Sequence, residues 1–208
     1  MPFDSVFWVA NGVGLVAFAL VGASKAVREG FDPFGVAVVG LVTAFGGGTT
    51  RDVLVSRLPL SLQSLSNVGF GLAGVALAVV LSTLVDEPDR HPYTVFADAV
   101  GLGAFATTGA LVAADVGVSP FGVVTIATVN AVGGGALADV LLDRPPFVLI
   151  RDVYASCAVF GGCTYVALAA ATGASGLAAG GCAAVTVGAR VVAVRRGWQL
   201  PTVRERLA

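Results

Sequence analysis

Residues 46–54 read GGGTTRDVL, and residues 133–141 read GGGALADVL. Each stretch lies inside an apolar segment long enough to cross a bilayer, which takes roughly 20 residues. Three successive glycines are unfavourable in a helix, because each costs roughly 1 kcal/mol relative to alanine. Backbone groups that a broken helix releases inside a membrane need partners in protein or in a water-filled cavity. The two stretches therefore predict interrupted helices that present main-chain carbonyls to an ion or a polar substrate.

The composition around these stretches is that of a polytopic membrane protein. The chain has 208 residues, of which 56% are hydrophobic and 12% are charged, and its mean hydropathy is +0.89. Soluble domains carry about 25% charged residues. The predicted fold is all-α, with seven transmembrane helices. We expect these spans at about residues 7–24, 34–55, 62–85, 95–114, 121–142, 153–172 and 177–194.

An internal duplication relates the two glycine-rich stretches. An offset of 87 residues, from Gly46 to Gly133, makes about half of the positions from 11 to 60 identical to their partners, including a Pro-Phe-Gly string at each helix start. Each copy holds three spans, so the second copy crosses the membrane in the opposite sense to the first. The interface of such inverted repeats typically carries a transport site near mid-bilayer. The predicted units are residues 1–87 (first repeat), 88–174 (second, inverted repeat) and 175–208 (seventh helix and basic tail).

The basic residues predict the orientation in the cell membrane. Seven spans place the two termini on opposite faces, and lysine and arginine are enriched in cytoplasmic loops. A cytoplasmic C-terminus and an external N-terminus put most of the basic residues inside. These are Lys25, Arg28, Arg90, Arg144, Arg151 and the arginines of the 195–206 tail.

The polar residues near the triplets are the candidate site. Charges at this depth usually face the bundle interior or a water-filled path, and carbonyls can replace part of a cation's hydration shell. The predicted hinge residues are Gly46, Gly47, Gly48, Gly133, Gly134 and Gly135, and the predicted pore-lining residues are Thr43, Thr49, Thr50, Arg51, Asp52, Asn130 and Asp139.

Structural roles remain open for the same residues. Glycines in membrane helices often serve close helix packing. Asp52 and Asp139 can instead cap helix ends or pair with Arg51 and Arg144. For Lys25 and Arg28 we expect snorkelling to the membrane interface. For Asn11 and Asp98, which occupy matched positions in the two repeats, helix capping is favoured over ion contact.

The pattern does not indicate an enzyme. It contains no nucleophile–base pair, no metal-binding cluster and no phosphate-binding loop. We therefore expect no cofactor, no metal beyond transient potassium and no nucleic-acid partner. The expected partners are a monovalent cation, membrane lipids and further copies of the chain.

The doubled Gly-Gly-Gly…Asp-Val-Leu motif and the two Pro-Phe-Gly starts resemble the prokaryotic trimeric intracellular cation (TRIC) channels, a family also labelled glycine transporter. The resemblance covers nearly the whole chain. It implies a homotrimer in which each protomer has its own pore between kinked second and fifth helices, with potassium favoured. Prokaryotic relatives often carry arginine before the aspartate in both repeats, whereas this chain has Arg51 in the first and Ala138 in the second. Animal relatives bind an inositol lipid through basic residues near the kink, where this chain offers Arg51 alone.

Three functions follow as hypotheses. The leading one is a potassium-permeable channel with a pore within each protomer. The alternative is a secondary transporter of a small zwitterion such as glycine, which works by alternating access. A structural or assembly protein without a permeation path is the third.

Overall fold

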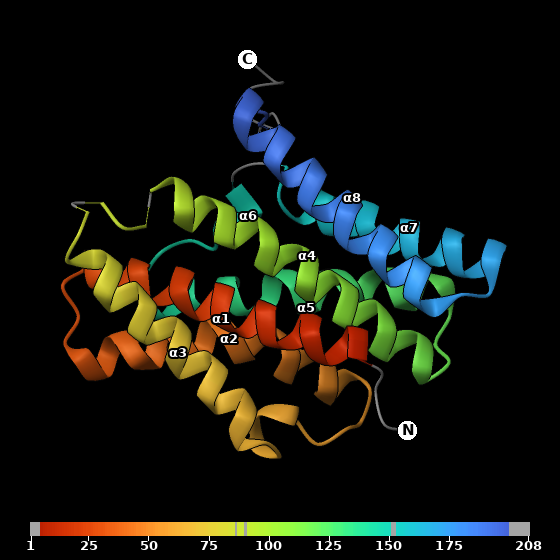
Figure 1. The fold of residues 1–208 in the computed structure, drawn as a ribbon, viewed down its shortest axis with the longest axis horizontal. Helices are drawn as coiled ribbons and strands as arrows, with labels where there is room; N and C mark the ends of the chain where they lie inside the picture. Colours follow the sequence, from red (N-terminus) through yellow and green to blue (C-terminus); the bar gives the residue numbers. More distant parts are fainter. Residues whose placement is uncertain (1–4, 86, 90, 151–152, 200–208) are drawn as a thin grey trace.

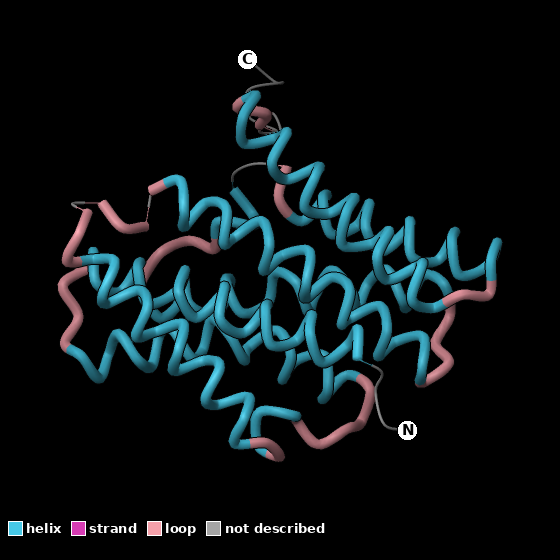
Figure 2. Tube along the Cα trace, viewed as in Figure 1, coloured by secondary structure: helices cyan, strands magenta, loops and turns pink. Residues whose placement is uncertain are grey.

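The computed structural model describes residues 5–85, 87–89, 91–150 and 153–199, and this part of the chain is helical, without strands (Figure 2). Seven of its helices are long and apolar enough to cross a membrane, as predicted. The spans are α1 (Ser5–Arg28), α2 (Pro33–Leu54), α3 (Leu65–Ser82), α4 (Pro92–Asp115), α5 (Pro120–Leu141), α7 (Ala155–Thr172) and α8 (Ser175–Arg196). Two short helical segments, η1 (Leu60–Leu62) and α6 (Phe147–Ile150), were not predicted, because three or four residues carry no readable periodicity.

The second helix of each repeat starts within one residue of its predicted start. Asp32 accepts a hydrogen bond from the Gly35 amide at the start of α2 (2.7 Å), and Ser119 accepts one from the Gly122 amide at the start of α5 (3.2 Å). In both helices a proline follows the cap, where its missing N–H costs nothing. The two repeats therefore begin their second helix with the same local chemistry.

The bundle is organised around α1 and α4, which pack against each other (Figure 1). In each of these two helices 67% of the membrane-spanning window is buried, against 39% in α2 and α5 and 28% in α3 and α7. The equal values in the matched helices show that the two repeats occupy equivalent places. The seventh span, α8, packs against α4 and α7.

Large apolar side chains cover the outside of the bundle. Leu65, Phe34 and Phe121 are 89%, 78% and 80% exposed, and most of the other exposed large hydrophobics also lie on the spans. A soluble domain does not present so much contiguous apolar surface. The chain is therefore a multi-pass membrane protein whose outer face meets lipid.

Candidate functional site

The glycine triplets do not break their helices. α2 runs as α-helix from Pro33 to Leu54 and α5 from Pro120 to Leu141, so the predicted interruption and release of carbonyls are wrong for this structure. The reason is that the glycines are used for close packing. A Cβ added at Gly47 would collide with the Asn130 carbonyl oxygen, and one at Gly134 with the Thr43 carbonyl oxygen.

These two contacts are the same contact seen from each repeat. Gly47 and Gly134 are 87 residues apart, and so are Thr43 and Asn130. α2 and α5 thus cross with their backbones touching, in a way that only glycine permits. We call this contact the glycine crossing, made by Gly46, Gly47, Gly133 and Gly134. It closes the space between α2 and α5 where the pore was predicted.

A cavity of about 600 Å³, lined by both charged and apolar side chains, lies beside the glycine crossing, in the half of the bundle where α1 and α5 end and α4 begins. We call it the large cavity. Its walls come mainly from α1, α4, α5, residues 144–150 and Tyr154, and α2 contributes only Thr43 among the described residues. Three carboxylates and four cationic side chains line it, namely Asp89, Asp98, Asp139, Lys25, Arg28, Arg144 and Arg190.

Ion pairs between separate elements line this cavity. Lys25 of α1 donates to Asp139 of α5 (2.8 Å), with side chains 22% and 6% exposed. Arg28 pairs with Asp89. Arg190 of α8 lies 3.5 Å from Asp98 of α4 (Nε to Oδ2). Each carboxylate of the cavity therefore already has a protein cation beside it.

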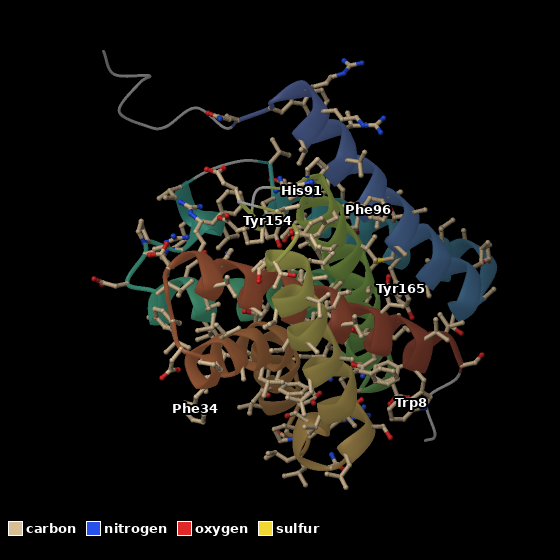
Figure 3. The ribbon with its side chains drawn as sticks, turned by 60° about the vertical axis from the view of Figure 1, so that its left-hand side comes forward. Trp8, Phe34, His91, Phe96, Tyr154 and Tyr165 are labelled. Carbon is tan, nitrogen blue, oxygen red and sulfur yellow. The ribbon has the colours of Figure 1, made fainter. Side chains whose placement is uncertain are left out.

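Asp98 has a second partner at this end of the bundle. The Tyr154 hydroxyl donates to it (2.8 Å), and Tyr154 lies at the same end as His91, which precedes α4, and far from Trp8 near the start of α1 (Figure 3). Asp98 does not cap α4, whose N-cap is His91, so capping was a wrong expectation. Asn11, its match in the first repeat, donates to Asn67 (3.1 Å) and is no cap either.

A small cavity of about 20 Å³ lies on the other side of the glycine crossing. Nine of the residues that line it have their partner, 87 residues away, on the wall of the large cavity. They are Asn11, Phe45, Gly48, Thr49, Asp52, Leu60, Ser61, Asn67 and Phe105. The two cavities are thus the same feature of two inverted repeats, and one is open while the other is almost filled.

Arg51 fills the small cavity. Its guanidinium pairs with Asp52 (2.7 Å) and lies over the Phe7 ring, and its side chain is 2% exposed. The matched residue in the second repeat is Ala138, which is fully buried and supplies no cation. The two repeats thus differ at this position by one buried cation.

The two aspartates of the motif also have matched structural roles. Asp52 accepts from the Leu60 amide (3.0 Å), and Asp139 accepts from the Phe147 amide (2.9 Å). They thereby fix η1 and α6 against the end of the preceding helix. Asp139 pairs with Lys25, whereas Arg144 pairs with Glu29, so the expected Asp139–Arg144 pair does not form.

Some of the other predicted site residues line one of the two cavities, and Thr50 and Asn130 line neither. Gly135 joins Thr43 and Asp139 on the large cavity, and Gly48 and Thr49 line the small one. Thr50 donates to the Gly46 carbonyl (2.8 Å) rather than facing either cavity. Asn130 is fully buried at the glycine crossing and donates to the Phe105 carbonyl (2.5 Å) and the Thr108 hydroxyl (3.0 Å).

Sequence reasoning missed Lys25, Asp98, Tyr154 and Arg190 as members of the site. Lys25 was expected to snorkel, but it reaches Asp139, which is 114 positions away in the chain. Arg190 lies five residues before the basic end of α8 and could be recognised only as an isolated arginine within an apolar span. The high cost of placing a charge inside a membrane could have indicated that the charged residues within apolar spans belong to the site.

Comparisons with known proteins agree with the duplication. The sequence model of the family described as Glycine transporter matches residues 8–83 and, again, residues 95–170, and these two ranges are offset by 87 residues. A UPF0126 membrane protein of Deinococcus radiodurans is 38% identical over 161 residues, which are 76% of this chain and 74% of that protein. The UPF0126 membrane protein YvgT of Bacillus subtilis is 36% identical over 151 residues, covering 72% and 74%.

Solved structures are similar over almost the whole chain. One, reported for conductance through TRIC cation channels, has a TM-score of 0.84 at 32% identity and covers 94% of this chain and 96% of that one. Another, the TRIC trimeric intracellular cation channel orthologue from Rhodobacter sphaeroides, has a TM-score of 0.81 at 30% identity, with 94% and 100% covered.

Proposed function

This chain belongs to the Glycine transporter family, and from that premise we propose that it is a channel that conducts monovalent cations, potassium among them, through each protomer. The observation that carries the proposal is the large cavity, a space inside an otherwise apolar bundle that is lined by three carboxylates, each paired with a protein cation, and that reaches Thr43 beside the glycine crossing. Structural neighbours described as TRIC cation channels support cation permeation. Their trimeric assembly is the basis for proposing a homotrimer.

The proposed path runs through the large cavity, past the glycine crossing and into the small cavity. It does not run directly between α2 and α5, because these helices touch at their glycines and the large cavity lies beside them. In the conformation described here the path is closed by the glycine crossing and by the Arg51–Asp52 pair. Conduction therefore requires α2 and α5 to separate or Arg51 to leave the small cavity.

We also propose that the large cavity faces the cytoplasm. The ends of α1 and α5 lie on the same side of the bundle as the end of α8, because these three spans run in the same direction. Basic residues gather there, which is typical of a cytoplasmic face. The N-terminus is then external.

Gly135 offers a direct test. It lines the large cavity, and a Cβ added there meets nothing within 4 Å. Gly135→Leu therefore fills the cavity without disturbing helix packing. Gly188 of α8 is a matched control, since it is equally open but faces outward.

The measurement is single-channel recording in planar bilayers under a potassium chloride gradient. We expect unitary cation currents from the wild type and from Gly188→Leu, and currents reduced at least several-fold in Gly135→Leu. If the folded wild type gives no current steps, the channel proposal fails.

A second candidate is supported by the paired cavities. One cavity is open and its repeat-related counterpart is nearly filled, which is the arrangement expected of one end state in alternating access. A transporter of a small zwitterion such as glycine would then exchange the two states. It predicts saturable, substrate-coupled flux from liposomes in place of discrete current steps, because alternating access is far slower than conduction.

A further inference from the structure

α8, the span outside the duplication, contributes a buried cation to the wall of the large cavity. The Arg190 side chain is 6% exposed, and its Nε lies 3.5 Å from Asp98 Oδ2. Its guanidinium carbon lies 4.7 Å from the centre of the Tyr154 ring and 5.8 Å from that of Phe147. The two rings and the carboxylate hold the guanidinium in a fixed place, so its charge is a permanent feature of the cavity wall.

The first repeat shows what this position looks like without a cation. Asn11 and Asn67 are the matches of Asp98 and Tyr154, and they form a neutral hydrogen-bonded pair (3.1 Å). The second repeat has a carboxylate where the first has an amide. A charge buried in a membrane needs a partner, and the partner comes from α8 rather than from within the repeat.

This arrangement affects any ion in the large cavity. The carboxylate of Asp98 attracts cations, and the guanidinium of Arg190 beside it cancels most of that attraction at a distance. Asp139 and Asp89 are paired with Lys25 and Arg28, whose side chains are 22% and 34% exposed and can move toward water. Of the three cations Arg190, Lys25 and Arg28, Arg190 is the one that is held most firmly.

We propose that Arg190 sets the charge preference of the large cavity by neutralising Asp98. The proposal rests on the proposed function in so far as the cavity is part of an ion path. Replacement of Arg190 by a neutral residue leaves Asp98 without its cation, and the carboxylate adds its negative charge to the wall at any pH at which it is ionised. The cavity then favours cations over anions more strongly, by roughly three- to tenfold for one unit charge at this range.

The test uses variants that change one charge at a time in the full chain. Arg190→Gln removes the cation, and Arg190→Lys keeps it. Asp98→Asn combined with Arg190→Gln gives the second repeat the neutral chemistry of Asn11 and Asn67. Arg195→Gln is the matched control, because Arg195 lies on the same helix but is exposed beyond the cavity.

Two readouts separate this inference from the proposed function. The first is the reversal potential in a potassium chloride gradient, which gives the permeability ratio of potassium to chloride. The second needs no conduction. A cysteine at Ala136, which lines the large cavity, is modified by a cationic and by an anionic methanethiosulfonate reagent, with Cys157, Cys163 and Cys182 replaced beforehand. The ratio of the two rates reports the charge of the cavity and is independent of the amount of folded protein.

We expect Arg190→Gln to raise both ratios three- to tenfold, and the double variant, Arg190→Lys and Arg195→Gln to stay within twofold of the wild type. If both ratios are equal in Arg190→Gln and the wild type, the inference is overturned. The proposed function still stands in that case, provided that the wild type conducts cations. A wild type without currents, in which Arg190→Gln still shifts the modification ratio, supports the inference and rejects the channel.

Discussion

Gly134 and Gly135 are neighbours in one helix but meet different surroundings. A Cβ at Gly134 would collide with the Thr43 carbonyl oxygen of α2, whereas a Cβ at Gly135 enters the open cavity. The neighbour at Gly134 is backbone and cannot turn aside. The same glycine type therefore serves helix packing at one position and cavity volume at the next.

This contrast gives a prediction within a single triplet. Gly134→Ala should destabilise the protein by about 1–3 kcal/mol, the usual cost of overpacking. Gly135→Ala should stabilise it by about 0.5–1 kcal/mol, because alanine favours the helix. Thermal unfolding in detergent measures both. Equal unfolding temperatures for the two variants would contradict the glycine crossing.

Asp52 and Asp139 differ in what their loss leaves behind. Each accepts a backbone N–H, and each neutralises a cation, but Arg51 is 2% exposed and Lys25 is 22% exposed. A buried guanidinium without its carboxylate is costly, whereas an ammonium at a cavity wall can be hydrated. The two aspartates therefore occupy equivalent positions in the sequence but contribute unequally to the free energy of unfolding.

We expect Asp52→Asn to destabilise by about 3 kcal/mol or more, and Asp139→Asn by less than half of that. Asparagine keeps an acceptor for the backbone amide, so the comparison isolates the loss of charge. Chemical or thermal unfolding of the two variants side by side gives the difference. The reasoning fails if Asp139→Asn proves the more damaging change.

The sequence motif alone indicates which aspartates matter but not what they contact. Their spacing, the glycine triplets and the 87-residue offset are local or periodic features, which a reader of the chain can find. The partners of the aspartates are not local or periodic features, since Lys25 pairs with Asp139 across 114 positions. The helix interruption was wrongly predicted because intrinsic propensity was weighed alone, and tertiary packing of α2 on α5 outweighs it.

At the scale of elements, α1 and α4 are held together by a reciprocal contact. The Phe105 ring lies where a side chain at Gly14 would be, and the Phe18 ring lies where one at Gly101 would be. The two rings meet edge to face, with centroids 5.1 Å apart. Because each pair is the repeat-related copy of the other, one geometry is used twice at the centre of the bundle.

A methyl group at either glycine should force the two central helices apart. We expect Gly101→Ala to destabilise by about 1–3 kcal/mol, and Phe18→Leu to restore part of the loss by making room. Gly69→Ala on α3 is the control, since nothing lies within 4 Å of its added Cβ. A double-mutant cycle of unfolding free energies measures the coupling, and additive effects would argue against the reciprocal contact.

The positions of the helices in the sequence were largely predictable, but the contacts between the helices were not. All seven spans were predicted from apolar length, and the Pro-Phe-Gly strings mark the starts of α2 and α5. The contribution of α8 to the cavity wall could not be predicted this way, because Arg190 reaches Asp98 only when α8 packs on α4. The large cavity likewise depends on which helices leave space between them.

At the scale of the whole molecule, two cavities of unequal size flank one helix crossing. The proposed orientation places the open one toward the cytoplasm. A matched pair of cysteines at the two ends of α8 checks this in intact cells, with Cys157, Cys163 and Cys182 removed. We expect Ser175→Cys to react with a membrane-impermeant thiol reagent and Gln199→Cys to react only after the cells are opened. The reverse pattern would invert the proposed topology.

The size of the large cavity also determines where a membrane potential acts. A space of about 600 Å³ lined by seven charged side chains has room for on the order of 20 water molecules, and hydrated space of this kind carries little of the voltage drop. The field is therefore concentrated in the thin layer of protein formed by the glycine crossing and the small cavity. Arg51 lies in that layer, and a full unit charge displaced across it gains about 2.3 kcal/mol per 100 mV. In the proposed channel Arg51, which has alanine at the matched position of the second repeat, is therefore a charge placed where the barrier is shortest.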